Sequence, residues 1–177
     1  MQSASLRCLN VCRHPAVNAV LFQVGWFVCV IGGNFAALAY TTIYLLFHFG
    51  WYSQLKGEWR YTVAIASTGI VLDSCNLWLG VFSSPEGFPL WLACLWLLVA
   101  TVIPHGLYWL RARPLLAIAC GAIGGAGSYT AGIQLGAASS ENLFASQLIW
   151  LAQWAVLFPV LLKACDWIPG NQQAQVS

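Results

Sequence analysis

Asp73 is the one acid that lies well inside a hydrophobic run of the sequence, which extends from Thr62 to Gly80. A carboxyl group at the centre of a bilayer costs roughly 2.5–3.5 kcal/mol to insert, so it needs a proton, a partner or a water-filled cavity. It could act as a proton acceptor, a cation site or a ligand anchor. Alternatively, it could hydrogen-bond to Asn76 or Tyr129 and join helices. Because intramembrane acids are more often functional, the first interpretation is favoured.

The other polar side chains fall into layers according to their depth in the membrane. Depth is counted from the nearest basic residue at 1.5 Å per helical residue. Asp73 comes out at ~20 Å, Tyr129 and Gln147 at ~24 Å, and His105 at only ~9 Å. An Asp73–His105 pair is therefore not expected. A deeper layer of Asp73, Asn76, Tyr129 and Gln147 is predicted, with His105 and Asn18 in an inner layer and Gln23 and Gln153 between. The candidate functional residues are Asp73, Asn76, His105, Tyr129, Gln147 and Gln23.

No metal site, cofactor or nucleic-acid surface is predicted. Cys8 and Cys12 precede His14, but structural zinc takes four ligands at recognised spacings. Most of the seven cysteines lie in or beside apolar runs, where a free cysteine behaves as a small hydrophobe. A net charge of +2 leaves no large basic patch for nucleic acid. The sequence contains no P-loop, H-E-x-x-H or Rossmann motif.

The composition indicates a membrane protein. The chain is 60% hydrophobic and 7% charged, whereas a soluble domain has about 25% charged residues. A protein with so few charged residues can expose its surface to the lipid bilayer but not to water. We predict one all-α domain over residues 1–177, a polytopic bundle of six transmembrane helices. The predicted helices are residues 16–32, 35–49, 61–82, 88–110, 114–136 and 142–165. Gly32, Gly33 and Asn34 form the break between the first two, which could instead be a re-entrant hairpin.

The basic residues orient this bundle. With six crossings, all seven fall on one side, with both termini, and the links on the other side carry only Glu86 and Glu141. The links are short, so the positive-inside rule places both termini in the cytoplasm. The basic residues are Arg7, Arg13, Lys56, Arg60, Arg111, Arg113 and Lys163.

Several glycines are expected to let helices approach closely. The fifth segment carries two G-x-x-x-G runs, from Gly121 to Gly125 and from Gly132 to Gly136. Gly69 and Gly80 share the small-residue stripe of Asp73. This packing could serve a homodimer, but packing within the bundle is the favoured interpretation. Pro104 is expected to loosen the fourth segment just before His105.

Several stretches resemble a bacterial membrane family called domain of unknown function 2878. They include Gly69-Ile-Val-Leu-Asp73, His105-Gly-Leu-Tyr-Trp-Leu-Arg111 and Gly124-Gly-Ala-Gly-Ser-Tyr129. The resemblance runs from about Asn18 to Leu162. It implies a multi-pass protein of the proteobacterial inner membrane, with genes often near those for fatty-acyl modification, and it implies no established activity. Family members often have Asn where this chain has Pro104.

Three functions are compatible with these features. The leading one is a small transporter or binder of a lipid-like or small apolar solute, with a polar cavity around Asp73. The second is a membrane lipid-modifying enzyme in which Asp73 or His105 is a general base. It requires a second ionisable group at matching depth, and the sequence offers no clear one. The third is an accessory subunit that holds a membrane-associated enzyme. Membrane lipids are the expected partners in each case.

Overall fold

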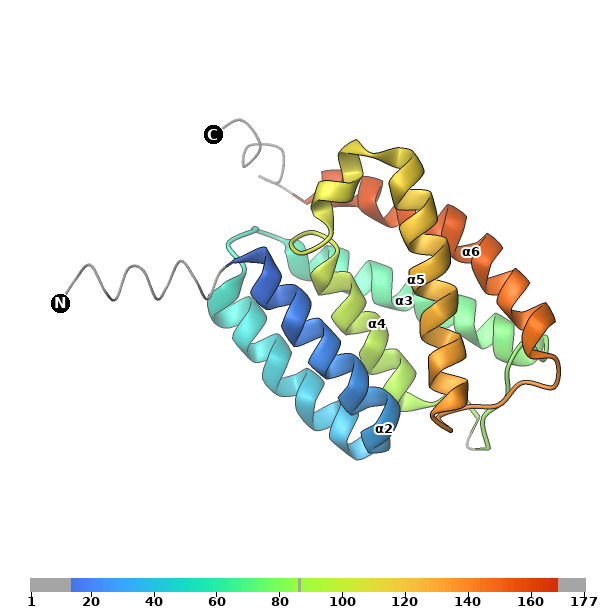
Figure 1. The fold of residues 1–177 in the computed structure, drawn as a ribbon. Helices are drawn as coiled ribbons and strands as arrows, with labels where there is room; N and C mark the ends of the chain where they lie inside the picture. The colour runs from blue at the N-terminus through green and yellow to red at the C-terminus, as the bar shows by residue number, and fades with distance from the viewer. Residues whose placement is uncertain (1–13, 86, 169–177) are drawn as a thin grey trace.

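The regular structure of the described residues is helical. A computed structural model describes residues 14–85 and 87–168, in which the one β-bridge joins Ser83 and Ser139. The helices are α2 (Pro15–Phe47), the π-helix η1 (His48–Tyr52), α3 (Glu58–Trp78), α4 (Leu90–Val102), the 3-10 helix η2 (Tyr108–Ala112), α5 (Pro114–Gln134), α6 (Leu143–Ala164) and the 3-10 helix η3 (Cys165–Trp167) (Figure 1). The predicted all-α class is confirmed.

Element α2 is a helical hairpin. Gly33 interrupts it with φ 69° and ψ −171°, a left-handed backbone that glycine adopts at no steric cost. The two arms then run side by side in opposite directions (Figure 1). The Tyr40 hydroxyl donates to the carbonyl oxygen of Leu21 at 2.6 Å, and the Asn18 amide donates to the Tyr44 hydroxyl at 2.8 Å. The break predicted at residues 32–34 is therefore the turn of this hairpin.

Helix α4 is shorter than the sequence suggested. It ends at Val102, so the predicted single helix over residues 88–110 is wrong. Pro104 has no backbone N–H to give, and its ring would clash with the carbonyl of Ala100 if the helix continued. The chain instead turns through residues 103–107 and resumes as η2. His105 lies in this turn.

The other predicted boundaries differ by a few residues. Helix α3 begins at Glu58 and ends at Trp78, not at residues 61 and 82, because Gly80 turns the chain with φ 72°. Helices α5 and α6 end within two residues of their predicted limits.

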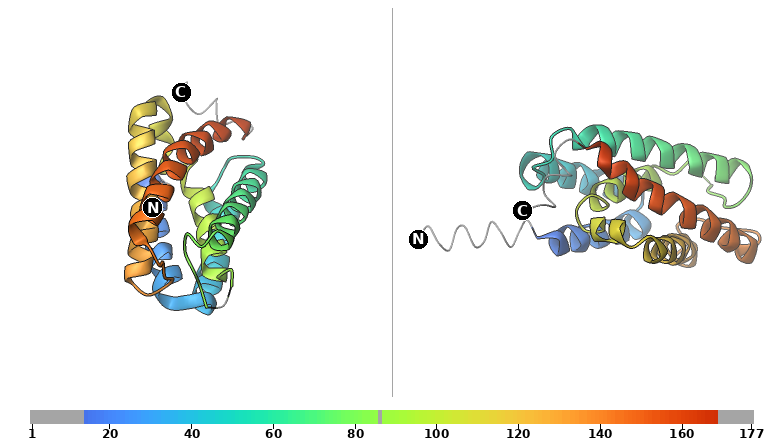
Figure 2. Two further views of the ribbon diagram at one scale, coloured as in Figure 1. Left: turned by 90° about the vertical axis from the view of Figure 1, so that its right-hand side faces the viewer. Right: turned by 90° about the horizontal axis from the view of Figure 1, so that it is seen from above.

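The helices pack in two groups joined through α3. Helix α4 packs against the α2 hairpin and α3, whereas α5 packs chiefly against α6. Figure 2 shows α6 crossing from α5 toward α3. The Tyr61 hydroxyl of α3 donates to the Leu161 carbonyl of α6 at 3.0 Å. One hydrophobic core fills the space among α3, α4, α5 and α6, and a second lies between α2 and α4.

Many large apolar side chains face outward, as expected for a surface in lipid. Phe35 and Leu115 are each more than 80% exposed. Among the described residues, three helical stretches are long and apolar enough to cross a membrane: Pro15–Tyr52, Pro114–Gln134 and Leu143–Trp167. Helix α4 is apolar but short, and α3, with Asp73 and Asn76, is not among the three. These features are consistent with a membrane protein.

Candidate functional site

Asp73 is fully buried at a point where three helices meet. Its carboxylate accepts a hydrogen bond from the Trp96 indole of α4 at 2.7 Å. The Tyr129 hydroxyl of α5 lies 2.7 and 2.8 Å from its two oxygens, and the Asn76 amide donates from 3.3 Å. All of these neighbours are donors, so both oxygens act as acceptors. The predicted proximity of Asp73, Asn76 and Tyr129 is thus present, and Trp96, which the sequence did not single out, is a further partner.

The remaining polar residues of the deeper layer have other partners. Gln153 of α6, not Gln147, completes the network, because its amide exchanges two hydrogen bonds with that of Asn76 at 2.8 and 3.1 Å. Gln147 instead donates to the Thr130 hydroxyl at 3.1 Å. Gln23 is exposed on α2 and lines a cavity described next. The Asp73 network therefore connects α3, α4, α5 and α6.

An apolar cavity of about 660 Å³ lies beside this network. Its wall is formed by α2, α4, α5 and α6 and is rich in aromatic side chains, among them Trp26, Trp96, Tyr129, Trp150, Trp154 and Phe158. Asp73 does not line it. Trp96 and Tyr129 stand between the carboxylate and the cavity, so the polar cavity expected around Asp73 is replaced by an apolar one with Asp73 behind its wall.

The predicted packing glycines fall into two classes. A Cβ atom on Gly69 would come within 1.9 Å of the Trp96 ring, and one on Gly125 within 2.1 Å of the Trp154 ring. A Cβ atom on Gly121 would come within 2.4 Å of the Phe158 side chain. Close approach therefore requires glycine at these three positions, all within one chain. In contrast, Gly80 and Gly136 turn the chain at helix ends with positive φ, and Gly132 has no atom within 4 Å of its Cβ position.

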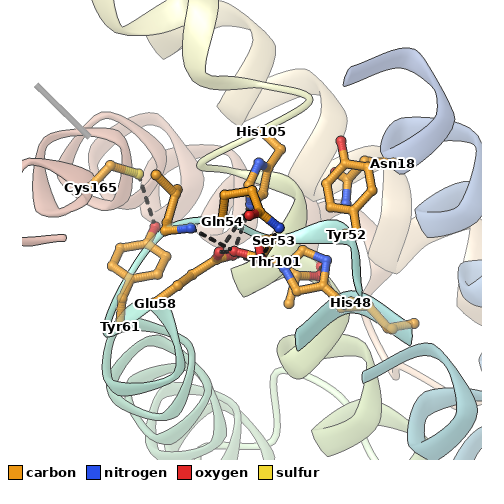
Figure 3. Close-up of polar contacts among 12 residues, drawn as sticks. Asn18, His48, Tyr52, Ser53, Gln54, Glu58, Tyr61, Thr101, His105 and Cys165 are labelled. Carbon is orange, nitrogen blue, oxygen red and sulfur yellow. Dashed lines mark hydrogen bonds and ion pairs between the residues drawn. The ribbon is translucent and has the colours of Figure 1, made fainter. Parts of the chain in front are cut away.

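A second polar cluster forms where three helices are irregular. It joins His48, which begins the π-helix η1, Glu58, which begins α3, and His105, in the turn after α4 (Figure 3). The His48 Nε2 atom lies 2.9 Å from Glu58 Oε1, and His105 Nε2 lies 3.0 and 3.1 Å from the two carboxylate oxygens. Single-turn π segments are frequent at functional sites. The sequence predicted an inner polar layer at His105 but missed His48 and Glu58.

The His48–Glu58–His105 cluster is almost closed to solvent. The side chains of His48 and Glu58 are each 1% exposed and that of His105 is 15% exposed. Burial alone would raise the pKa of the Glu58 carboxyl, but the hydrogen bonds from His105 and His48 outweigh it and lower that pKa to about 2. The Ser53 hydroxyl donates to the second carboxylate oxygen. The carboxylate is therefore ionised at neutral pH and surrounded by donors.

The cluster provides ligand atoms that a metal ion could use. One nitrogen of each histidine and one carboxylate oxygen lie within 4.8 Å of one another. Among residues 14–85 and 87–168, this is the group of three or more His, Cys, Asp or Glu side chains that is close enough to share a metal ion. The sequence predicted no metal at Cys8, Cys12 and His14. The two cysteines lie outside the described residues, and the Nδ1 atom of His14 caps α2 by accepting from the Ala16 amide.

Comparison with known proteins places the chain in a family but does not assign an activity. Neither the search of curated proteins nor that of solved structures gives a match. The family model described as a protein of unknown function (DUF2878) matches residues 15–160, which include Asp73, the cavity wall and all three residues of the His48–Glu58–His105 cluster. The chain therefore belongs to the DUF2878 family.

Proposed function

We propose that this protein is a multi-pass protein of the bacterial inner membrane that binds a lipid-like molecule in the apolar cavity. The cavity carries the proposal, because 660 Å³ falls in the range of small-molecule sites. Its wall is apolar with a few polar groups, as in such sites. Ser128, Tyr129 and Gln23 are among the polar residues that line it. An acyl chain fits the wall, and a small polar group at its end could bond to these residues.

The access route supports a ligand that arrives from the bilayer. Helices α2 and α5 are bridged at the cavity by the hydrogen bond from the Trp26 indole to the Ser128 hydroxyl, 2.7 Å long. Gln23 and Phe27 of α2 and Gly124 of α5 line the cavity and are themselves exposed. The cavity thus opens on the side between these helices. At this depth the surrounding medium is lipid if α2 and α5 both span the membrane.

We further propose that the chain crosses the membrane six times with both termini in the cytoplasm. The first arm of α2, and the second arm together with η1, each have ~18–19 residues and so span ~27–29 Å. At one end of the bundle, Asn34 accepts from the Trp91 amide and Ser83 pairs with Ser139. Arg111 pairs with Asp166 at the other. Lys56, Arg60, Arg111, Arg113 and Lys163 lie in or beside the links of that second end, as the positive-inside rule requires.

In this proposal Asp73 positions the cavity wall and does not touch the ligand. Its bonds to Trp96 and Tyr129 fix two aromatic rings that face the cavity. The glycines of α5 leave room in the cavity wall. Gly124 lines the cavity and has no atom within 4 Å of its Cβ position. A binder of this kind could also move its ligand, since a glycine-rich helix deforms more easily than others.

The proposal is tested by a substitution at Gly124 that places a large side chain in the cavity. The Gly124→Trp variant is expected to reduce crosslinking to a diazirine-bearing fatty acid in nanodiscs at least ~10-fold, because the new ring occupies the ligand's space. Gly127→Trp is the matched control, since Gly127 is on the same helix, has the same free Cβ space and does not line the cavity. Crosslinks should map to cavity residues in the wild type. Equal labelling of the two variants would contradict the proposal.

A second candidate function, a membrane lipid-modifying enzyme, is favoured by the His48–Glu58–His105 cluster. In this cluster Glu58 is the second ionisable group beside His105, which was not evident from the sequence. Val102 and Leu107, on either side of the His105 turn, line the cavity. Complementation of a deletion strain with His105→Gln tests this function by lipid mass spectrometry. A lipid profile equal to that of the wild type would exclude catalysis by His105.

A further inference from the structure

We propose that His48, Glu58 and His105 bind one divalent transition-metal ion. The inference does not rest on the lipid-binding function, because it concerns a different group of residues. Three features of the His48–Glu58–His105 cluster carry it: the spacing of its ligand atoms, their chemical identity and the hydrogen bonds behind His48.

The spacing suits a shared ion. Two ligand atoms that are each ~2.1 Å from a metal, at angles of ~90–109°, lie ~3.0–3.4 Å from each other. The separations of the two Nε2 atoms from the Glu58 oxygens are 2.9, 3.0 and 3.1 Å, and one nitrogen of each histidine and one carboxylate oxygen all lie within 4.8 Å of one another. A small movement of one ring would bring all three to an ion. The same nitrogen of both imidazoles points at the same carboxylate, although the two rings are tilted by 76° to one another.

The identity of the ligands narrows the choice of ion. Two imidazoles and one carboxylate are the ligand set of non-haem iron(II) and of many catalytic zinc sites. Calcium and magnesium prefer oxygen ligands alone. Three protein ligands leave at least one coordination position for water or a ligand, which is typical of catalytic and not of structural sites. The partial exposure of His105 gives the route by which an ion enters.

The hydrogen bonds behind His48 are compatible with a metal on Nε2. A metal-bound histidine donates its other ring N–H to a neighbouring group, and His48 Nδ1 lies 3.5 Å from the Tyr44 hydroxyl. Thr101 Oγ1 lies 2.8 Å from the Leu98 carbonyl oxygen, which can only accept, and 3.1 Å from the Tyr44 hydroxyl. The Asn18 amide also donates to the Tyr44 hydroxyl oxygen at 2.8 Å, so this hydroxyl is held in place beside Nδ1. An ion on Nε2 would take the place of the hydrogen bond that this nitrogen makes to Glu58 without metal, and Nδ1 would keep the Tyr44 hydroxyl as its partner.

The experiment uses the full chain in nanodiscs, purified with a tag that contains no histidine and stripped with a chelator. Titration with Co²⁺ is expected to give visible absorption bands that saturate at one ion per chain and disappear when Zn²⁺ is added. Substitution of a residue that hydrogen-bonds to a metal ligand typically weakens metal binding ~10–100-fold. The His105→Gln variant loses a ligand itself, so we expect Co²⁺ binding to weaken by more than ~100-fold. Tyr44→Phe should weaken it ~10-fold.

His14→Gln is the matched control, because His14 lies outside the His48–Glu58–His105 cluster. The Co²⁺ affinity of this variant should equal that of the wild type. Helical circular dichroism and size-exclusion profiles establish that each variant is folded. Glu58→Gln provides a second, nearly isosteric variant if His105→Gln fails to fold. Equal Co²⁺ affinity of the wild type and a folded ligand variant would overturn the proposal. Binding of the ion by cysteines would give this result, because the ligand substitutions leave the cysteines unchanged. The cluster would then be a hydrogen-bonded triad without metal.

Discussion

At the residue scale, the two buried acids of the described chain are satisfied in different ways. Asp73 is surrounded by neutral donors, from an indole, a phenol and an amide. Glu58 is held by two imidazoles, whose nitrogen atoms are common metal ligands. The first arrangement fixes helices relative to one another, and the second offers atoms that can coordinate an ion. Asp73 is therefore the better candidate for a structural role, and Glu58 for a chemical one.

The Tyr129→Phe substitution tests the structural role of Asp73. It removes a hydroxyl that donates to the buried carboxyl group, and the loss of one partner of a buried polar group costs about 1–3 kcal/mol. We expect a loss of stability of that order in thermal unfolding in detergent, followed by circular dichroism. Tyr40→Phe is the control, because its hydroxyl donates to the Leu21 carbonyl and a neutral bond contributes only about 0.5–1.5 kcal/mol. An equal or smaller loss for Tyr129→Phe would argue against a structural carboxylate.

Sequence reasoning found Asp73, Asn76 and Tyr129 by depth, because regular helices preserve the 1.5 Å rise on which the estimate depends. It missed the cluster for a physical reason. His48 is at the end of an apolar run and Glu58 is in a polar link, so neither violates the pattern of its surroundings. Only the hairpin of α2 and the turn at Pro104 bring them to His105. Trp96 was missed because its indole N–H does not register in a hydrophobic pattern.

At the element scale, α3 and α4 approach closely at a single glycine. The Cβ position of Gly69 would lie 1.9–2.3 Å from atoms of the Trp96 ring, a rigid group that stacks on Trp154 at 5.4 Å on its far side. Trp96 therefore cannot move without breaking its bond to Asp73 or displacing α6. Helix spacing, the cavity wall and the buried carboxylate all depend on the absence of a side chain at Gly69.

The Gly69→Ala substitution is accordingly expected to be destabilising, although alanine is the better helix former. Forcing a methyl group into a packed core costs about 1–3 kcal/mol, more than the roughly 0.5–1 kcal/mol gained in helix propensity. Gly127→Ala in α5 is the control, because its Cβ position has no neighbour within 4 Å, and it should gain that propensity term. Thermal unfolding in detergent should therefore shift in opposite directions for the two variants. A shift of both in the same direction would contradict the packing argument.

At the scale of the whole molecule, the sequence predicted helix positions better than helix continuity. The limits of α5 and α6 were close because a hydrophobic run with polar ends has one simple helical interpretation. Proline predicted a loosened α4, but not that the helix would stop at Val102 and carry His105 in a turn. Such a turn at membrane depth is tolerated only where protein or water surrounds it. Here Glu58 and the rings of His48 and Tyr52 surround His105.

Cysteine labelling distinguishes an α2 hairpin that crosses the bilayer twice from one that enters it and returns. Phe35, next to the Gly33 turn, is 86% exposed and lies at the same end as the Asn34–Trp91 bond. In a six-crossing bundle Phe35→Cys is on the periplasmic face. It should react with a membrane-impermeant maleimide in intact cells with a permeable outer membrane, as should Glu141→Cys. Lys56→Cys should react only after lysis, and the unsubstituted chain gives the background from native cysteines. A re-entrant hairpin would keep Phe35→Cys within the hydrocarbon and unlabelled while Glu141→Cys reacts.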